Sequence, residues 1–221
     1  ARKTLEQARL AAMDAADTQM PSLRVGIGLG WDMTAELAEF QDWIAGVYPQ
    51  AELTFISETF QRLHRLLALG ELDAIVCTKT SIQNYDALDI MEIAANETRV
   101  YVKKGLLRRP EQPLQVTDFR GQKLLMLPEE EAPMSREIVC SQFLAHRVSL
   151  EVVRLPNRDS ILQALLLGQG VSVFDQYMNF RDDPRLTFFR LEDSIPICVA
   201  WNKRSQNPLI RLFAEFFRGL R

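Results

Sequence analysis

The sequence predicts an α/β protein with two lobes, each built on a parallel sheet covered by helices. Three observations support this prediction. Helical patterns alternate with short apolar runs that are typical of buried strands. The alternation passes through three strands, pauses, and passes through three more. A last strand and helix then close the chain, and we expect them to return to the first lobe.

One stretch, Thr59–Cys77, contains the repeating unit in full. Its apolar residues fall on one face of a helix: Phe60, Leu63, Leu66 and Leu67. Gly70 follows, where a helix end favours a residue with left-handed backbone. The run Leu72–Val76 is apolar apart from one aspartate, as expected of a strand that is covered on both faces.

The elements of the first lobe are expected in the following order. Arg2–Ala16 is predicted to be a helix with a narrow stripe of small residues, which suits pairing with another helix. The expected strands are Leu23–Leu29, Ala51–Ser57, Leu72–Val76 and Ala87–Ala95. A helix near Met33–Val47 has one apolar face and ends at Tyr48-Pro49, because proline cannot continue a helix.

The second series begins after a strand at Arg99–Lys104 and a polar loop. Its expected strands are Lys123–Leu127, Leu150–Leu155 and Val171–Phe174, and its expected helices are Ser135–His146 and Ser160–Leu167. The stretch Arg181–Asp193 is predicted to be irregular. The chain closes with a strand at Ile197–Asn202 and an amphipathic helix whose apolar residues run from Leu209 to Leu220.

The composition is that of an ordinary folded domain. The 221 residues include 47% hydrophobic and 25% charged side chains, and the net charge is −3. This charge gives no electrostatic reason to expect nucleic-acid binding by this chain. No apolar run reaches membrane-spanning length, and we expect a cytoplasmic protein. Cys77, Cys140 and Cys198 lie far apart in apolar surroundings, which favours free thiols over disulfides or a metal site.

Five motifs, in this order, resemble the effector-binding domain of LysR-type transcriptional regulators. They are LRVGIGL, the stretch from Glu39-Phe40 through Tyr48-Pro49 to Glu52-Leu53, LLALGELDAIV, NRDSILQALLLGQGVSVF and VAWNKRSQNPLIRLFAEFFR. The resemblance covers the chain from end to end. One departure is Phe174-Asp175, where the family usually has Leu-Pro, and it places an acid at an expected ligand position.

The resemblance implies the type 2 periplasmic-binding-protein fold, with two Rossmann-like lobes joined by two crossover strands. The expected segments are 1–20 for the end of a linker helix, 22–102 with 198–221 for lobe I, and 103–197 for lobe II. It also implies a sensing function, in which a small-molecule effector binds in the cleft between the lobes and acts on a DNA-binding winged helix-turn-helix that this sequence does not contain. A solute-binding protein of a transport system, which shares the fold, is the alternative.

Effector contacts are expected on the loops that follow the strands, because the starts of helices present unpaired N–H groups there. The candidate residues are Gly30, Trp31, Asp32, Met33, Thr34, Glu58, Thr59, Phe60, Thr78, Pro128, Glu129, Glu130, Ser135, Arg158, Asp175 and Gln176. Helix N-termini favour anions, so a small organic acid is one expected effector class.

Several of these residues have two interpretations. Two roles are open for the acids Asp32, Glu58, Glu129 and Glu130. Their carboxylates either interact favourably with the positive end of a helix dipole or contact a cationic ligand. Trp31 either lines the ligand site or only packs. Thr34 and Ser135 are either helix N-caps or ligand contacts, and Arg158-Asp159 either holds a ligand or supplies a capping aspartate.

The resemblance further implies self-association, as an antiparallel homodimer and as a tetramer of the full-length protein. The candidate interface residues lie on two helices and are Glu39, Trp43, Arg136 and Phe143. Contact with DNA is expected only through the missing N-terminal domain. No catalytic motif is recognisable, and His64 and His146 have no metal-ligand residue at the required spacing. We therefore expect no enzyme, cofactor, metal or membrane partner.

Overall fold

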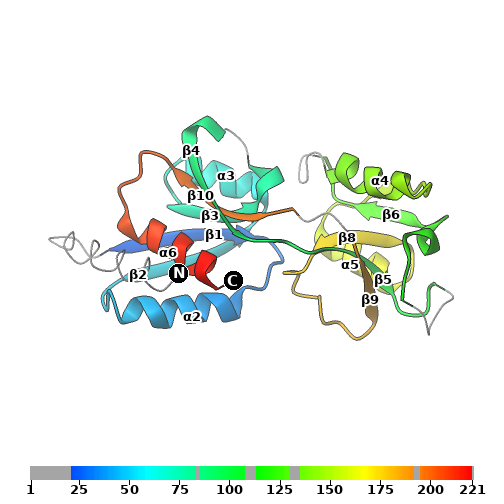
Figure 1. The fold of residues 1–221 in the computed structure, drawn as a ribbon, viewed down its shortest axis with the longest axis horizontal. Coiled ribbons are helices and arrows are strands. Elements are labelled where there is room, and N and C mark those ends of the chain that lie inside the picture. Colours follow the sequence, from blue (N-terminus) through cyan, green and yellow to red (C-terminus); the bar gives the residue numbers. More distant parts are fainter. Residues whose placement is uncertain (1–20, 83–84, 108–112, 130–134, 192–194, 221) are drawn as a thin grey trace. The chain divides into compact units, whose positions relative to one another are not determined.

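The computed structural model describes residues 21–82, 85–107, 113–129, 135–191 and 195–220. The chain divides into two compact units. The first holds the residues up to Ala95 and those from Pro196 onward, and the second holds Asn96–Ile195. The chain therefore passes twice from one unit to the other (Figure 1). The helix predicted at Arg2–Ala16 lies outside the described residues.

The first unit is built on a five-stranded sheet with the order β2-β1-β3-β10-β4. Its strands are β1 (Ser22–Gly28), β2 (Glu52–Glu58), β3 (Ala74–Thr78), β4 (Leu88–Ala94) and β10 (Ile197–Asn202). The strands β1, β2 and β3 are parallel, whereas β10 is antiparallel to both β3 and β4. The last strand thus returns to the first unit, as predicted.

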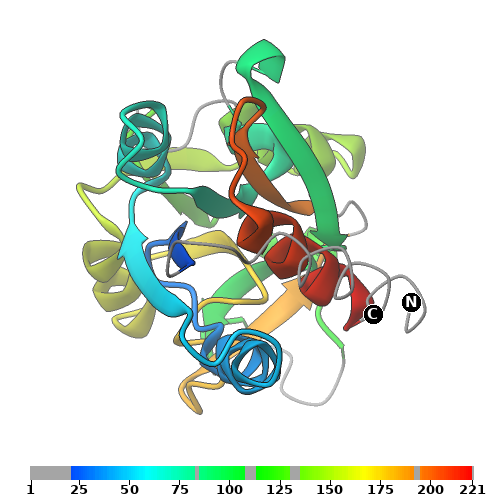
Figure 2. The same ribbon diagram turned by 90° about the vertical axis from the view of Figure 1, so that its left-hand side faces the viewer.

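Three helices cover the two faces of this sheet (Figure 2). On one face, α3 (Phe60–Ala68) packs Leu63 and Leu67 onto the buried side chains of β3 and β10. On the other face lie α2 (Thr34–Ala45) and α6 (Pro208–Gly219), where the rings of Phe40 and Phe213 meet edge to face at 5.0 Å.

The stretch Thr59–Cys77 has the predicted helix, turn and strand. Gly70 has φ of +73°, which a residue with a side chain rarely adopts. The residues Ala74–Cys77 of β3 are completely buried, because helices cover both faces. Asp73 accepts hydrogen bonds from the backbone N–H and the guanidinium of Arg24, and so fastens the start of β3 to β1.

The second unit has a sheet with the order β7-β6-β8-β5-β9. Its strands are β5 (Thr98–Lys103), β6 (Lys123–Met126), β7 (Glu151–Arg154), β8 (Val171–Asp175) and β9 (Leu186–Arg190). The helices α4 (Ser135–Ala145) and α5 (Arg158–Leu166) cover opposite faces (Figure 1), and a 3-10 turn, η3 (Val116–Phe119), precedes β6. The core beneath α4 includes Phe119, Leu124 and Phe143.

The structure corrects three parts of the prediction. The sheets are mixed, because β5 is antiparallel to both β8 and β9. The stretch Arg181–Asp193, predicted to be irregular, contains β9. The boundary predicted between 102 and 103 lies between Ala95 and Asn96, because β5 pairs only within the second sheet.

Candidate functional site

Each unit has an edge at which three parallel strands end together. In the first unit, Gly28 of β1 lies opposite Glu58 of β2, and Ile27 lies opposite Val76 of β3. The backbone N–H of Leu29 donates to the carbonyl oxygen of Glu58 at 2.8 Å, which holds the first two strand ends side by side. In such sheets, ligands bind beyond the carboxyl ends of the strands. The candidates from Gly30 to Thr78 lie at this edge.

The aromatic candidates at this edge form a packed pair. The ring centroids of Trp31 and Phe60 are 5.7 Å apart at 78°, and Trp31 is only 8% exposed. Gly28 makes room for them, because a Cβ there would lie 2.8 Å from the Phe60 ring. Met33 is also buried, and Gly30 turns the chain with φ of +82°. These contacts favour the packing interpretation of Trp31.

The polar candidates of the first unit are engaged locally. The N-cap of α2 is Met33 and not Thr34, and Asp32 Oδ1, one residue earlier, accepts from the N–H of Thr34 at 3.2 Å. Thr59 is the N-cap of α3, and its Oγ1 accepts from the N–H of Arg62 at 3.4 Å. Glu58 forms an ion pair with Arg62 at 3.1 Å. The Thr78 carbonyl accepts from the Ser81 hydroxyl at 2.8 Å.

The second unit has the corresponding edge at the ends of β6, β7 and β8. The N–H of Leu155 donates to the carbonyl oxygen of Met126 at 2.9 Å, and the half-buried Pro128 follows β6. Glu129 is ion-paired with Arg154, whose guanidinium also donates to the Leu127 carbonyl at 2.8 Å. Glu130 and the side chain of Ser135 lie outside the part that the structure describes.

Helix α5 begins at this edge. Asn157 is its N-cap, with Oδ1 accepting from the N–H of Ser160 at 2.9 Å, so the capping role predicted for Asp159 belongs to Asn157. Arg158 is half-buried in the first turn, and Asp159 beside it is exposed. At the end of β8, Asp175 Oδ1 accepts from the N–H of Tyr177 at 2.9 Å, and Gln176 between them is half-buried.

Two residues of β5 reach the same edge and are absent from the predicted set. Thr98 lies opposite Asp175 in the β5–β8 register, and the Tyr101 hydroxyl donates to the Asp175 carbonyl at 3.4 Å. Thr98 is 7% exposed, and its buried hydroxyl has no hydrogen-bond partner among the described residues. The sequence gives no local signal for them, because only antiparallel pairing brings the start of β5 to the end of β8.

The four interface candidates have different environments. Glu39 is exposed on α2. Trp43 is half-buried and packs against Phe216 of α6, with ring centroids 5.4 Å apart. Phe143 is 1% exposed and contacts Phe119 within its own unit, so its place at an interface was wrongly predicted: the side chain fills the core. The side chain of Arg136 is outside the described set.

The described residues contain no cluster of three or more potential metal ligands. Cys77 and Cys198 lie opposite each other on β3 and β10, are fully buried and form no disulfide. Burial raises the pKa of the Cys77 thiol to about 12 and that of Cys198 to about 11. Both thiols therefore stay protonated near neutral pH and act as small apolar side chains. None of the helices described is both long and apolar enough to cross a membrane.

Two α/β units joined by two chain passages, each with an edge at which three parallel strands end, are the architecture of the type 2 periplasmic-binding-protein class. The family model of the LysR substrate binding domain matches residues 36–220. The chain therefore belongs to the LysR substrate-binding-domain family, and its role is that of a regulatory domain.

Several solved structures share this fold. The LysR family regulator CbnR aligns with a TM-score of 0.71 at 17% identity, over 99% of this chain and 76% of that chain. The effector-binding domain of QuiR in complex with shikimate aligns at 0.72 and 11% identity, over 91% and 97%. The reduced regulatory domain of OxyR2 from Vibrio vulnificus aligns at 0.72 and 15% identity, over 93% and 98%. At these identities the likeness establishes the fold. No curated protein sequence matches the chain.

Proposed function

We propose that this domain senses a small organic acid whose carboxylate binds at the carboxyl-end edge of the second unit. Binding there would favour one state of the regulator and so alter DNA binding by a domain outside this chain. We further propose that the protein is cytoplasmic and self-associates as an antiparallel dimer, with a tetramer in the full-length regulator. The QuiR structure supports the effector class by analogy, because it holds shikimate, a ring carboxylate.

The observation that carries this proposal is the position of Arg158. It lies half-buried in the first turn of α5, where the helix dipole disfavours a positive charge. A bound carboxylate would be stabilised by both the guanidinium and the N–H groups of this turn. Asp159 contributes one opposing charge, but its side chain is exposed, so water screens it more strongly.

The ion pairs formed by the acids at both edges argue against a cationic ligand. Glu58 and Glu129 each have an arginine partner, Arg62 and Arg154 respectively. A cationic ligand would have to displace these arginines from their carboxylates.

The test is a thermal unfolding screen of the chain with small carboxylates and their uncharged amide analogues. A ligand at 100 times its dissociation constant stabilises the folded state by about 2.7 kcal/mol. We expect the melting temperature to rise by roughly 5–10 °C for a cognate carboxylate. The amide of the same acid should give little shift.

Arg158→Gln should abolish this carboxylate-dependent shift while leaving the melting temperature of the free chain nearly unchanged. The matched control is Arg120→Gln, since Arg120 is exposed in the same unit and follows η3, away from the strand ends. A carboxylate shift that persists in Arg158→Gln would contradict the placement, and a screen in which only amines stabilise the chain would contradict the ligand class.

A further inference from the structure

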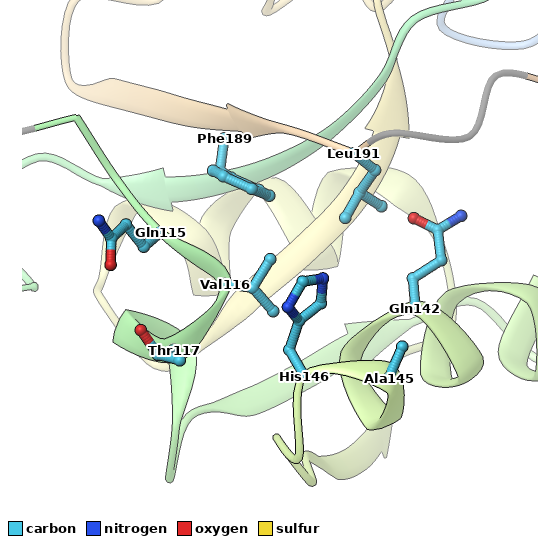
Figure 3. A pocket seen from close by; sticks show the side chains of 8 residues that line it. All are labelled: Gln115, Val116, Thr117, Gln142, Ala145, His146, Phe189 and Leu191. Carbon is cyan, nitrogen blue, oxygen red and sulfur yellow. The ribbon is translucent and has the colours of Figure 1, made fainter.

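A hollow of about 380 Å³ lies in the second unit, on the face of the sheet covered by α4. Its walls are the C-terminal half of α4, the segment 115–117 and the edge strand β9 with Leu191 beyond it (Figure 3). None of the candidate effector residues that the structure describes lines it. The volume falls within the range of small-molecule sites, roughly 300–1,000 Å³.

The floor of this hollow is apolar. Val116, Phe189 and Leu191 point toward one another in Figure 3, and all three belong to or pack against the core beneath α4. The Phe189 ring is held by an edge contact with Phe119, at 5.9 Å between centroids. A flat apolar ring would therefore find a preformed surface here.

One polar group in the wall lacks a partner. Gln142 Oε1 is buried and has no hydrogen bond among the described residues. Leaving a buried amide atom unpaired costs about 1–3 kcal/mol, so a ligand that pairs it gains by doing so. The oxygen and nitrogen of a glutamine amide can exchange places, and a hydroxyl satisfies either, because it both donates and accepts.

The charge of the walls restricts the ligand further. Of the described residues that line the hollow, His146 is the only ionisable one. A charged ligand would lose hydration without gaining an ion pair, which is costly. We propose that this hollow is an accessory site for a small, uncharged aromatic molecule carrying a hydroxyl group, independent of the effector edge.

The test titrates the chain with phenol and with toluene, which has the ring without the hydroxyl, and follows the imidazole proton signals by NMR. The chain has only two histidines, so His146 reports on the hollow and His64, in the first unit, is the internal control. We expect phenol to move the His146 signals in a saturable way and to leave those of His64 unchanged.

Two substitutions separate what the Gln142 amide contributes to probe binding from what the empty volume of the hollow contributes. In Gln142→Leu, the ratio of phenol to toluene affinity should fall by about fivefold or more, because the hydrogen bond is removed. Ala145→Phe should fill the hollow and abolish binding of both probes. Leu144→Phe is its control, because Leu144 is 59% exposed and does not line the hollow.

Three outcomes at the hollow itself would overturn the proposal. They are absence of saturable binding by either probe, an unchanged affinity ratio in Gln142→Leu, and binding that survives Ala145→Phe. Asn157→Ala perturbs the effector edge and should not alter the phenol titration. If phenol binding is lost in Asn157→Ala instead, the probe occupies the effector edge. Failure of the carboxylate screen would leave this test unaffected, because the two use different ligands and residues.

Discussion

Asp73 lies in a sequence motif, and its side chain has a structural role in the fold. It belongs to the Gly-Glu-Leu-Asp run, and its carboxylate accepts three hydrogen bonds from Arg24, at 2.8–3.2 Å. The same guanidinium donates to the carbonyl of Gly70 at 2.7 Å. The motif aspartate therefore fixes the turn between α3 and β3, at the opposite end of β3 from the candidate site.

Gly170 provides a test of close packing at the residue scale. A Cβ at this position would lie 2.5 Å from the Lys123 carbonyl oxygen, a backbone atom that cannot move aside cheaply. We expect Gly170→Ala to lower the free energy of unfolding by about 1–3 kcal/mol, measured by urea denaturation.

The control for this substitution is Gly46→Ala. Gly46 follows α2 in helical backbone, and its Cβ would meet nothing closer than 3.4 Å. Its stability should be unchanged or raised by up to about 1 kcal/mol. Equal losses in the two variants would show that close approach to β6 is not what requires glycine at position 170.

His64 gives the domain a pH-dependent stability. Burial lowers its pKa below the ordinary 6.5, although a hydrogen bond to the Ser81 carbonyl opposes this. The unfolded chain then takes up the proton before the folded chain does. Stability should therefore be full above pH 6.5 and fall as the pH drops from 6.5 toward the folded-state pKa, by at most about 1.4 kcal/mol per pH unit.

Urea unfolding at pH 7.5 and 5.5 measures this dependence. His64→Gln should reduce the loss of stability between the two pH values, whereas His146→Gln, on the exposed end of α4, should keep it. An identical loss in wild type and His64→Gln would assign the acid sensitivity to other groups.

At the scale of elements, the helix starts are fixed by side chains that also stand at the candidate site. Thr59 and Asn157 are the side-chain N-caps of α3 and α5, and Asp32, just before the N-cap Met33, accepts from the N–H of Thr34 in α2. A capping side-chain oxygen accepts from one first-turn N–H group. The other first-turn N–H groups remain unpaired and point beyond the strand ends. The same local chemistry that starts each helix therefore leaves donors for an anion.

At the scale of the whole molecule, the proposed self-association can be tested on helix α2. Trp43 is a poor place to test it, because the ring joins α2 to α6 and its loss would loosen the first unit. Glu39 is exposed on the same helix and allows a cleaner test. Reversal of a charge at an interface disfavours association by like-charge contact or by loss of an ion pair.

We expect Glu39→Arg to weaken the proposed dimer by about tenfold, which corresponds to roughly 1.4 kcal/mol, in sedimentation velocity over a range of concentrations. Glu71→Arg, an equal charge change at an exposed turn beyond α3, is the control and should sediment like wild type. If both variants associate equally, α2 is not at the interface, and a wild type that never self-associates would contradict the dimer itself.

The sequence by itself determined most of the elements, since their signals are local, but it missed β9. The apolar spacing of Thr59–Cys77, Gly70 at the helix end and the motif order were enough for the fold class and the family. Tertiary structure alone decided the rest. Antiparallel pairing brought Thr98 to Asp175, and packing buried Phe143 and Trp31. Contacts between residues far apart in the chain leave no local pattern, because their partners are chosen by the sheet order and not by the neighbouring sequence.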